Sequence, residues 1–186
     1  ALTLDCNPRY CYLDPYTGSA IAVAEAARNV VCVGAQPLAI TDGLNFGSPE
    51  KPEIFSQLRR GIEGIAAACR ALGLPVTGGN VSLYNETDGQ AIYPTPIIGM
   101  LGLLENADDC LTAGWQQDGH VIVLLGETKE ELGGTEFLSV VHGLEGGKAP
   151  QLDLDREKRV QASVLQAVRE GLLASAHDCS EGGLAV

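Results

Sequence analysis

One glycine-rich segment carries several polar side chains that could bind a nucleotide. It runs from Thr77 to Glu86 (TGGNVSLYNE) and directly follows a short apolar run typical of a strand. Gly78 and Gly79 could point successive backbone N–H groups at an anion, and Asn80 could ligate a hard cation. Ser82 could hydrogen-bond an oxyanion. The segment predicts a binding site for Mg²⁺ and phosphate. The alternative is a Gly-Gly turn without a binding function.

Two further polar segments follow apolar runs. Asp42 begins the segment DGLNFG at 42–47, where binding loops of α/β proteins commonly lie. It could hold Mg²⁺ or accept a hydrogen bond from a ribose or a base, and an Asx-turn is the alternative. His177 and Asp178 stand before Ser180-Glu181-Gly182-Gly183, where a new helix start would favour phosphate and Asp178 could add a magnesium ligand.

Several common catalytic schemes do not fit the sequence. The segment 143–149 resembles a P-loop, but its glycine spacing is one residue short and Ala149 replaces the required Ser or Thr. No dinucleotide-binding G-x-G-x-x-G follows a strand, and no G-x-S-x-G elbow provides a nucleophile. The six cysteines form no C-x-x-C pair, which argues against a thiolate metal site.

Hydrophobic periodicity predicts helices alternating with short strands, and hence an α/β fold. Ser19 is the expected N-cap of the first helix and Gly34 its stop, whereas Pro52 and Gly73 bound the second. Further helices are expected at 135–142 and 153–173. The predicted strands are residues 37–41, 74–77, 97–104 and 121–125. A change in composition places a domain boundary near 105–112.

Composition and charge narrow the class of protein. The chain has 186 residues, is 45% hydrophobic and carries a formal net charge of -12, which would repel nucleic acid and anionic lipid. No apolar run reaches the length of about 18 residues that a membrane span requires. We therefore expect a globular cytoplasmic protein with neither a nucleic-acid nor a membrane partner.

Seven collinear segments closely resemble the second half of the small-type phosphoribosylformylglycinamidine synthase family, within the aminoimidazole ribonucleotide synthetase-like superfamily. They are residues 5–18, 22–55, 77–86, 93–102, 126–137, 147–155 and 175–184. The resemblance implies a synthetase N-terminal-like α+β domain at 1–105, of a type that pairs into a shared barrel. It also implies the start of a C-terminal-like α/β domain at 106–186, in a chain that is a fragment of a longer enzyme.

The resemblance further implies an ATP- and Mg²⁺-dependent ligase of purine biosynthesis. Such an enzyme converts formylglycinamide ribonucleotide and ammonia, obtained from glutamine, into the amidine. Carried over by motif, Asp42 and Gly79 contact ATP, Asn80 binds Mg²⁺ and Ser82 contacts the ribonucleotide. Asp178 would serve a second, auxiliary nucleotide site.

The implied partners are a glutaminase subunit, a small bridging subunit and the missing first half of the parent chain. The family's catalytic histidine lies in a His-Asn-His-Pro type segment that this sequence lacks, so we expect no catalytic residue here and an inactive isolated chain. The alternatives are a kinase of the same superfamily, against which the segment LNFGSPEKPEIF argues, and a non-catalytic nucleotide-binding or structural module.

Overall fold

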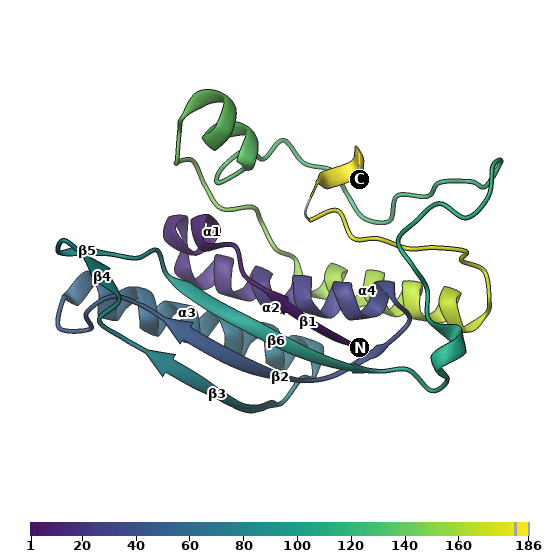
Figure 1. Ribbon diagram of the computed structural model, residues 1–186, viewed down its shortest axis with the longest axis horizontal. Coiled ribbons are helices and arrows are strands. Elements are labelled where there is room, and N and C mark those ends of the chain that lie inside the picture. Colours follow the sequence, from purple (N-terminus) through teal and green to yellow (C-terminus); the bar gives the residue numbers. More distant parts are fainter. Residues whose placement is uncertain (181, 186) are drawn as a thin grey trace.

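A four-stranded sheet organises the N-terminal half of the molecule (Figure 1). The computed structural model describes residues 1–180 and 182–185. The strands lie in the order β1 (Leu2–Asp5), β6 (Thr95–Leu103), β2 (Gln36–Asn45) and β3 (Val76–Ser82). β6 is antiparallel to β1 and β2, whereas β2 and β3 are parallel. β3 is therefore an edge strand, with one side of its backbone unpaired in the sheet.

Two long helices pack against the sheet. α2 (Pro15–Cys32) begins one turn earlier than predicted, because the Asp14 side chain accepts hydrogen bonds from the N–H groups of Tyr16 and Thr17. Ser19 is fully buried within the helix, so its prediction as the N-cap is wrong. Gly34 follows the helix with a φ of 90°, as expected of a stop residue.

Helix α3 (Pro52–Leu72) has the bounds that the sequence predicts. Pro52 occupies the first helical position, where its missing N–H costs nothing, and Gly73 ends the helix in the left-handed conformation with a φ of 74°. Its buried side chains include Ile54, Ile65 and Cys69, which face the sheet and α2.

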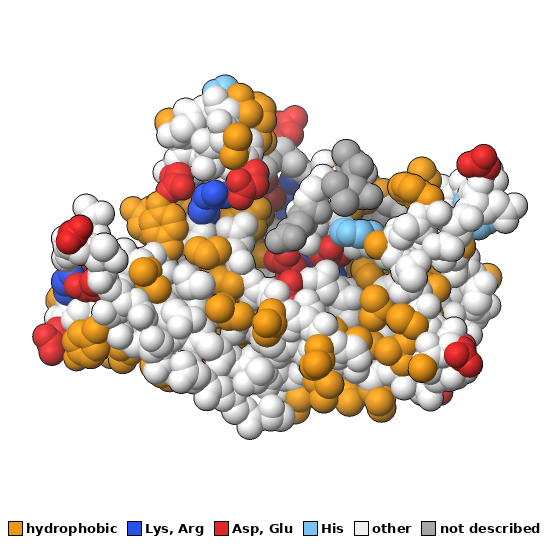
Figure 2. All heavy atoms as spheres, in the orientation of Figure 1, with side chains coloured by type: hydrophobic (Ala, Val, Ile, Leu, Met, Phe, Trp, Pro, Cys, Tyr) orange, Lys and Arg blue, Asp and Glu red, His pale blue; other side chains and the backbone are white. Residues whose placement is uncertain are grey.

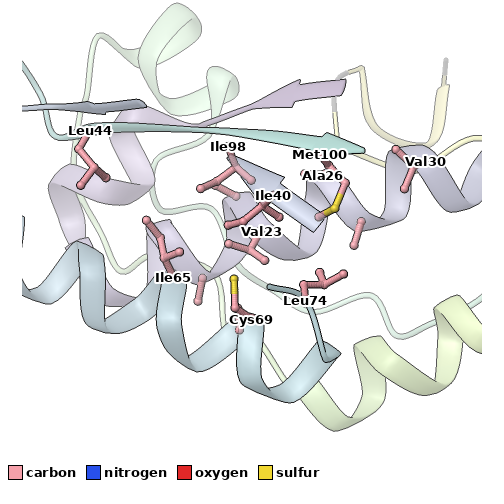
Figure 3. Close-up of a cluster of buried hydrophobic side chains, with 14 of the residues drawn as sticks. Val23, Ala26, Val30, Ile40, Leu44, Ile65, Cys69, Leu74, Ile98 and Met100 are labelled. Carbon is pink, nitrogen blue, oxygen red and sulfur yellow. The ribbon is translucent and has the colours of Figure 1, made fainter. Parts of the chain in front are cut away.

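The core lies between the strands and these helices (Figure 3). Ile40, Ile98 and Met100 extend from the central strands toward Val23 of α2 and Ile65 of α3. Alanines along α2 allow close packing. Each fully buried Val, Ile or Met side chain in this core contributes about 1.5–3 kcal/mol. The sheet is thus held rigidly enough to position residues on β2 and β3.

The strands that carry the expected site are longer than predicted. β2 continues through Asp42 to Asn45, and β3 continues through Gly78, Gly79 and Asn80 to Ser82. The two polar segments that we expected to be loops are strand ends, because parallel pairing supplies the backbone hydrogen bonds that their turn-forming composition argued against.

The C-terminal part contains long irregular stretches around one helix. α4 (Leu154–Arg169) is capped by Asp153 and packs on α2 and α3. It ends before the predicted residue 173. The prediction of a strand at 121–125 is wrong. In the described part of the chain these residues form no strand, and their apolar side chains are exposed and pack on no sheet. The helix expected at 135–142 is a short π-helix, η2 (Phe137–Val141).

The remaining elements are short. They are α1 (Pro8–Leu13), the hairpin strands β4 (Glu86–Thr87) and β5 (Gln90–Ala91), and the 3₁₀ turns η1 (Ala107–Asp109) and η3 (Gly183–Ala185). Within the described residues, none of the helices combines the length and apolar character needed to cross a membrane.

Candidate functional site

The parallel register between β2 and β3 brings the predicted site residues together. Asp42 stands opposite Gly79, Gly43 opposite Asn80, and Asn45 opposite Ser82. Because side chains alternate along a strand, Asn80 and Ser82 share one face of β3, whereas Gly79 belongs to the other. The four predicted residues therefore form two pairs on opposite faces of one sheet edge.

Asp42 and Gly79 are in direct contact. A Cβ added to Gly79 would lie 2.1 Å from Asp42 Oδ1 and 2.5 Å from the Asp42 carbonyl oxygen. Both distances are far shorter than a real Cβ contact, and the second atom is backbone that cannot rotate away. The absence of a side chain at Gly79 is thus what lets the carboxylate lie along the strand edge.

The Asp42 carboxylate is half-buried, and burial raises its pKa above the ordinary value of 3.8. Among the residues that the structure describes, no charged group offsets this shift. The carboxylate lies on the helix side of the sheet, where its charge also raises the pKa of the Cys69 thiol on α3, after the larger effect of burial. A bound cation, or a hydrogen-bond donor on a ligand, would relieve this cost.

The other face of β3 presents Asn80 and Ser82 toward solvent. Asn80 is exposed, and its side chain forms no hydrogen bond with another residue in the described part of the chain. Ser82 is half-buried, and its hydroxyl lies 3.1 Å from Nδ2 and 3.3 Å from Oδ1 of Asn85. The first side chain is therefore available to a ligand, whereas the second is held in a network.

The prediction that the backbone N–H groups of Gly78 and Gly79 form an anion-binding concavity is wrong. An anion-binding concavity of successive N–H groups requires a turn conformation, but neither glycine has a positive φ and both are in the extended strand β3. Successive N–H groups of a strand point in opposite directions. Any contact of Gly79 with a ligand would use close approach to an edge strand instead.

A second polar cluster surrounds Asp178. This carboxylate is buried, accepts a hydrogen bond of 2.7 Å from Ser180 and lies 3.6 Å from Nδ1 of His177. Burial raises the pKa of Glu25 on α2, a hydrogen bond with Ser180 and the charge of Arg28 oppose that shift, and the charges of Asp5 and Asp178 add to it. Residues far apart in the sequence therefore converge beside Glu25, in the C-terminal half of α2.

Two polar residues of α2 that the sequence analysis did not select belong to this cluster. Asn29 donates a 2.7 Å hydrogen bond to Asp5 Oδ1, and the charge of Asp178 acts on Glu25. The signal available in the sequence was their i, i+4 spacing on an otherwise apolar helix, which places both on one face.

Comparisons with known proteins define the class. The fold and the strand-edge site are those of an α/β protein in which two neighbouring strands present polar residues. Residues 1–104 match the family described as AIR synthase related protein, N-terminal domain, and residues 117–186 match its C-terminal domain. The chain belongs to the AIR synthase related protein family. The expected fold class is confirmed.

Two relatives that match the whole chain are both subunits of phosphoribosylformylglycinamidine synthase. The chain is 58% identical to the phosphoribosylformylglycinamidine synthase subunit PurL of Moorella thermoacetica and 60% identical to that of Symbiobacterium thermophilum. Both matches cover all of this chain but only 25% and 24% of the relatives. The resemblance stated from the sequence is confirmed, and the chain spans about a quarter of the length of these proteins.

Solved structures from Thermotoga maritima share the fold. PurL complexed with AMPPCP and PurL complexed with FGAR each superpose with a TM-score of 0.66 and 28% identity, covering 91% of this chain and 24% or 23% of theirs. The structure of PurLQS matches with a TM-score of 0.57 and 36% identity, over 61% of this chain and 19% of that one.

The donor set at the strand edge fits a hard cation shared with a phosphate. Mg²⁺ takes one or two protein oxygens and completes its octahedron with waters and substrate phosphates. Asn80 offers such an oxygen, and no group of three or more His, Cys, Asp or Glu residues that could hold a metal occurs among residues 1–180 and 182–185. This edge therefore suits a cation held jointly with a nucleotide and not an all-protein cage.

Proposed function

We propose that this chain provides the Asp42 and Gly79 contacts to ATP, the Asn80 ligand to Mg²⁺ and the Ser82 contact to the ribonucleotide in a phosphoribosylformylglycinamidine synthase. The reaction proposed is the ATP-dependent ligation of ammonia to formylglycinamide ribonucleotide, in the cytoplasm. The observation that carries the proposal is the β2–β3 register, which sets Asp42 opposite Gly79 and places Asn80 and Ser82 next along the same exposed strand, on its other face.

The ligands bound to related structures support the proposed binding of ATP and of formylglycinamide ribonucleotide. Thermotoga maritima PurL, which has the same fold as this chain, has been solved in complexes with AMPPCP, with ATP and with FGAR. Within residues 1–180 and 182–185, the Asp42 carboxylate has no charge that offsets its burial and the Asn80 side chain has no hydrogen bond; a nucleotide at Asp42 and a cation at Asn80 would satisfy these two groups.

In the proposed mechanism the chain binds and orients rather than transfers protons. ATP supplies the phosphoryl group that converts the amide oxygen into a leaving group before ammonia attacks. Asn80 would hold Mg²⁺, which would supply positive charge to the phosphates. Gly79 would let the nucleotide approach the backbone closely, and Ser82 would contact the ribonucleotide. Positioning and charge stabilisation are most of what a protein contributes to phosphoryl transfer.

The outer face of the sheet carries exposed apolar side chains on β1 and β6. Leu2 is 81% exposed and Leu4 76% exposed on β1, and Leu101 and Leu103 of the adjacent β6 are also exposed. Figure 2 shows hydrophobic side chains and few charges over most of the strands. Since soluble proteins rarely leave such a face uncovered, we propose that the first half of the parent chain packs here and completes the site.

We also propose that the chain contains two domains and assembles with further subunits. We place one domain at 1–105, which contains the whole four-stranded sheet, and the start of another at 106–186; the separate family matches to 1–104 and 117–186 support this division. The similarity to PurLQS from Thermotoga maritima supports an assembly with further subunits, which we propose are a glutaminase and a small bridging subunit.

The cluster at Asp178 is proposed as the auxiliary nucleotide site. Its carboxylates are Glu25 on α2 and the buried Asp178; burial raises the pKa of Glu25 although the Arg28 charge opposes the shift, so a further cation would favour its charged form. Glu25→Gln should weaken binding at this site without affecting Mg-ATP at Asp42, which is on a different element.

Calorimetry with Mg-ATP on this chain tests the proposal. We expect measurable binding that Asp42→Asn weakens. Binding by wild type and variant with equal affinity would contradict the assignment at the strand edge, and absence of binding to both would leave this chain a structural module.

A further inference from the structure

The side chain of Asn85 ties the ends of β2 and β3 to the Ser82 hydroxyl. Its Nδ2 donates to the Phe46 carbonyl oxygen at 3.1 Å and to the Ser82 carbonyl oxygen at 2.9 Å. These two acceptors take both N–H groups of the amide. The remaining oxygen, Oδ1, lies 3.3 Å from Ser82 Oγ, and Nδ2 itself lies 3.1 Å from it.

The surrounding backbone fixes Asn85 in turn. Its own N–H donates to the Phe46 carbonyl oxygen at 3.1 Å, and its carbonyl oxygen accepts from Ile92. The preceding residue, Tyr84, has a φ of 60°, which turns the chain back after Ser82, and its N–H donates to Gly47. Asn85 is thus anchored through both its backbone and its amide before any ligand binds.

We propose that Asn85 is a positioning residue that holds the Ser82 hydroxyl in one rotamer for the ribonucleotide. The inference rests on the proposed substrate role of Ser82. An exposed serine samples three staggered rotamers, so a hydroxyl that already contacts a fixed amide loses less freedom when substrate binds. Asn85 acts through Ser82 and touches no reacting atom.

A double-mutant cycle in the full-length synthase that contains this chain tests the inference. Asn85→Ala should raise KM for the ribonucleotide about 3- to 10-fold, the range of one lost hydrogen bond, with KM for ATP within about twofold of wild type. In a Ser82→Ala background the same change should leave KM for the ribonucleotide nearly unaltered, because the hydroxyl that Asn85 holds is already gone.

Glu86→Gln is the matched control. Glu86 accepts from the Ser48 N–H at 3.0 Å and from Lys51 at 2.9 Å, so it stabilises the same turn without contacting Ser82. It should lower the melting temperature and leave KM for the ribonucleotide unchanged. If Asn85→Ala does not fold, Asn85→Ser, whose short side chain lacks the amide that contacts Ser82, takes its place in the cycle.

The outcomes separate the two proposals. If Ser82→Ala raises KM for the ribonucleotide but Asn85→Ala does not, or if their effects simply add, the positioning role is overturned and the proposed function stands. If Ser82→Ala itself has no effect, the substrate role of Ser82 fails, and the positioning role fails with it. A crystal structure of Asn85→Ala gives an independent readout, because a Ser82 rotamer unchanged from wild type would overturn the inference whatever the kinetics.

Discussion

The carboxylate of Asp42 on β2 lies in the space that a side chain on Gly79 of β3 would occupy, 2.1 Å from the position of its Cβ. The two residues are Cα partners in the parallel register. This close approach links the fold to the proposed site, since the strand pairing and the orientation of the carboxylate depend on the same missing side chain.

Gly79→Ala should therefore cost about 1–3 kcal/mol of stability, the usual range for overpacking, and should weaken Mg-ATP binding by displacing Asp42. Gly79→Val should be worse. Gly78→Ala is the matched control, because a Cβ there meets no atom within 4 Å and its φ is not positive. Thermal unfolding and calorimetry of the three variants measure both effects. Equal stability and affinity for the Gly78 and Gly79 variants would refute the close approach.

Asp42→Asn should stabilise the chain at neutral pH while weakening its nucleotide site. Burial raises the folded-state pKa of Asp42, so the protonated form suits the fold and the ionised form costs free energy once the pH rises through that pKa. Below the unfolded value of 3.8 the cost vanishes. The variant should thus melt at a higher temperature than wild type at pH 7, with the difference shrinking as the pH falls toward 4.

The exposed Asp118 provides the comparison for this experiment. Asp118→Asn should leave the melting temperature almost unchanged across the same pH range. A destabilised Asp42→Asn variant at pH 7 would mean that the carboxylate has a stabilising partner within the fold, and would overturn the assignment of its raised pKa to burial alone.

Asn80→Ala in the full-length enzyme should lower activity mainly by raising the Mg²⁺ concentration required, because the cation loses an oxygen ligand. Excess Mg²⁺ should partly restore the rate. Asn80→Asp, which keeps an oxygen at the same position, should be much less affected. Steady-state rates across a Mg²⁺ titration distinguish the cases, and a wild-type Mg²⁺ dependence in Asn80→Ala would reduce Asn80 to an ordinary strand residue.

The sequence predicted helix ends where one residue type decides them. Pro52 and Gly73 bound α3 as expected, because a missing N–H and a left-handed φ are local properties. Ser19 failed as a cap since Asp14, followed by Pro15, offers a better one a turn earlier. Local chemistry alone could not choose between two plausible caps.

The site residues were identifiable, but their backbone was not. Gly, Asn and Asp are typical turn formers, so DGLN and GGN were expected to be loops. In the fold they are paired strands, because the register of β2 with β3 and β6 supplies partners that no local pattern reveals. For the same reason, the contact of Asp42 with Gly79 and the network of Asn85 with Ser82 became visible only in three dimensions.

The central claim is that this chain forms one wall of a divided active site, and an assay of ADP release and amidine formation tests it most directly. The purified chain is supplied with ATP, Mg²⁺, formylglycinamide ribonucleotide and free ammonia, alone and after addition of the separately expressed first half of the synthase. We predict no turnover by the chain alone and turnover on mixing. Robust amidine formation by the chain alone would contradict the divided site.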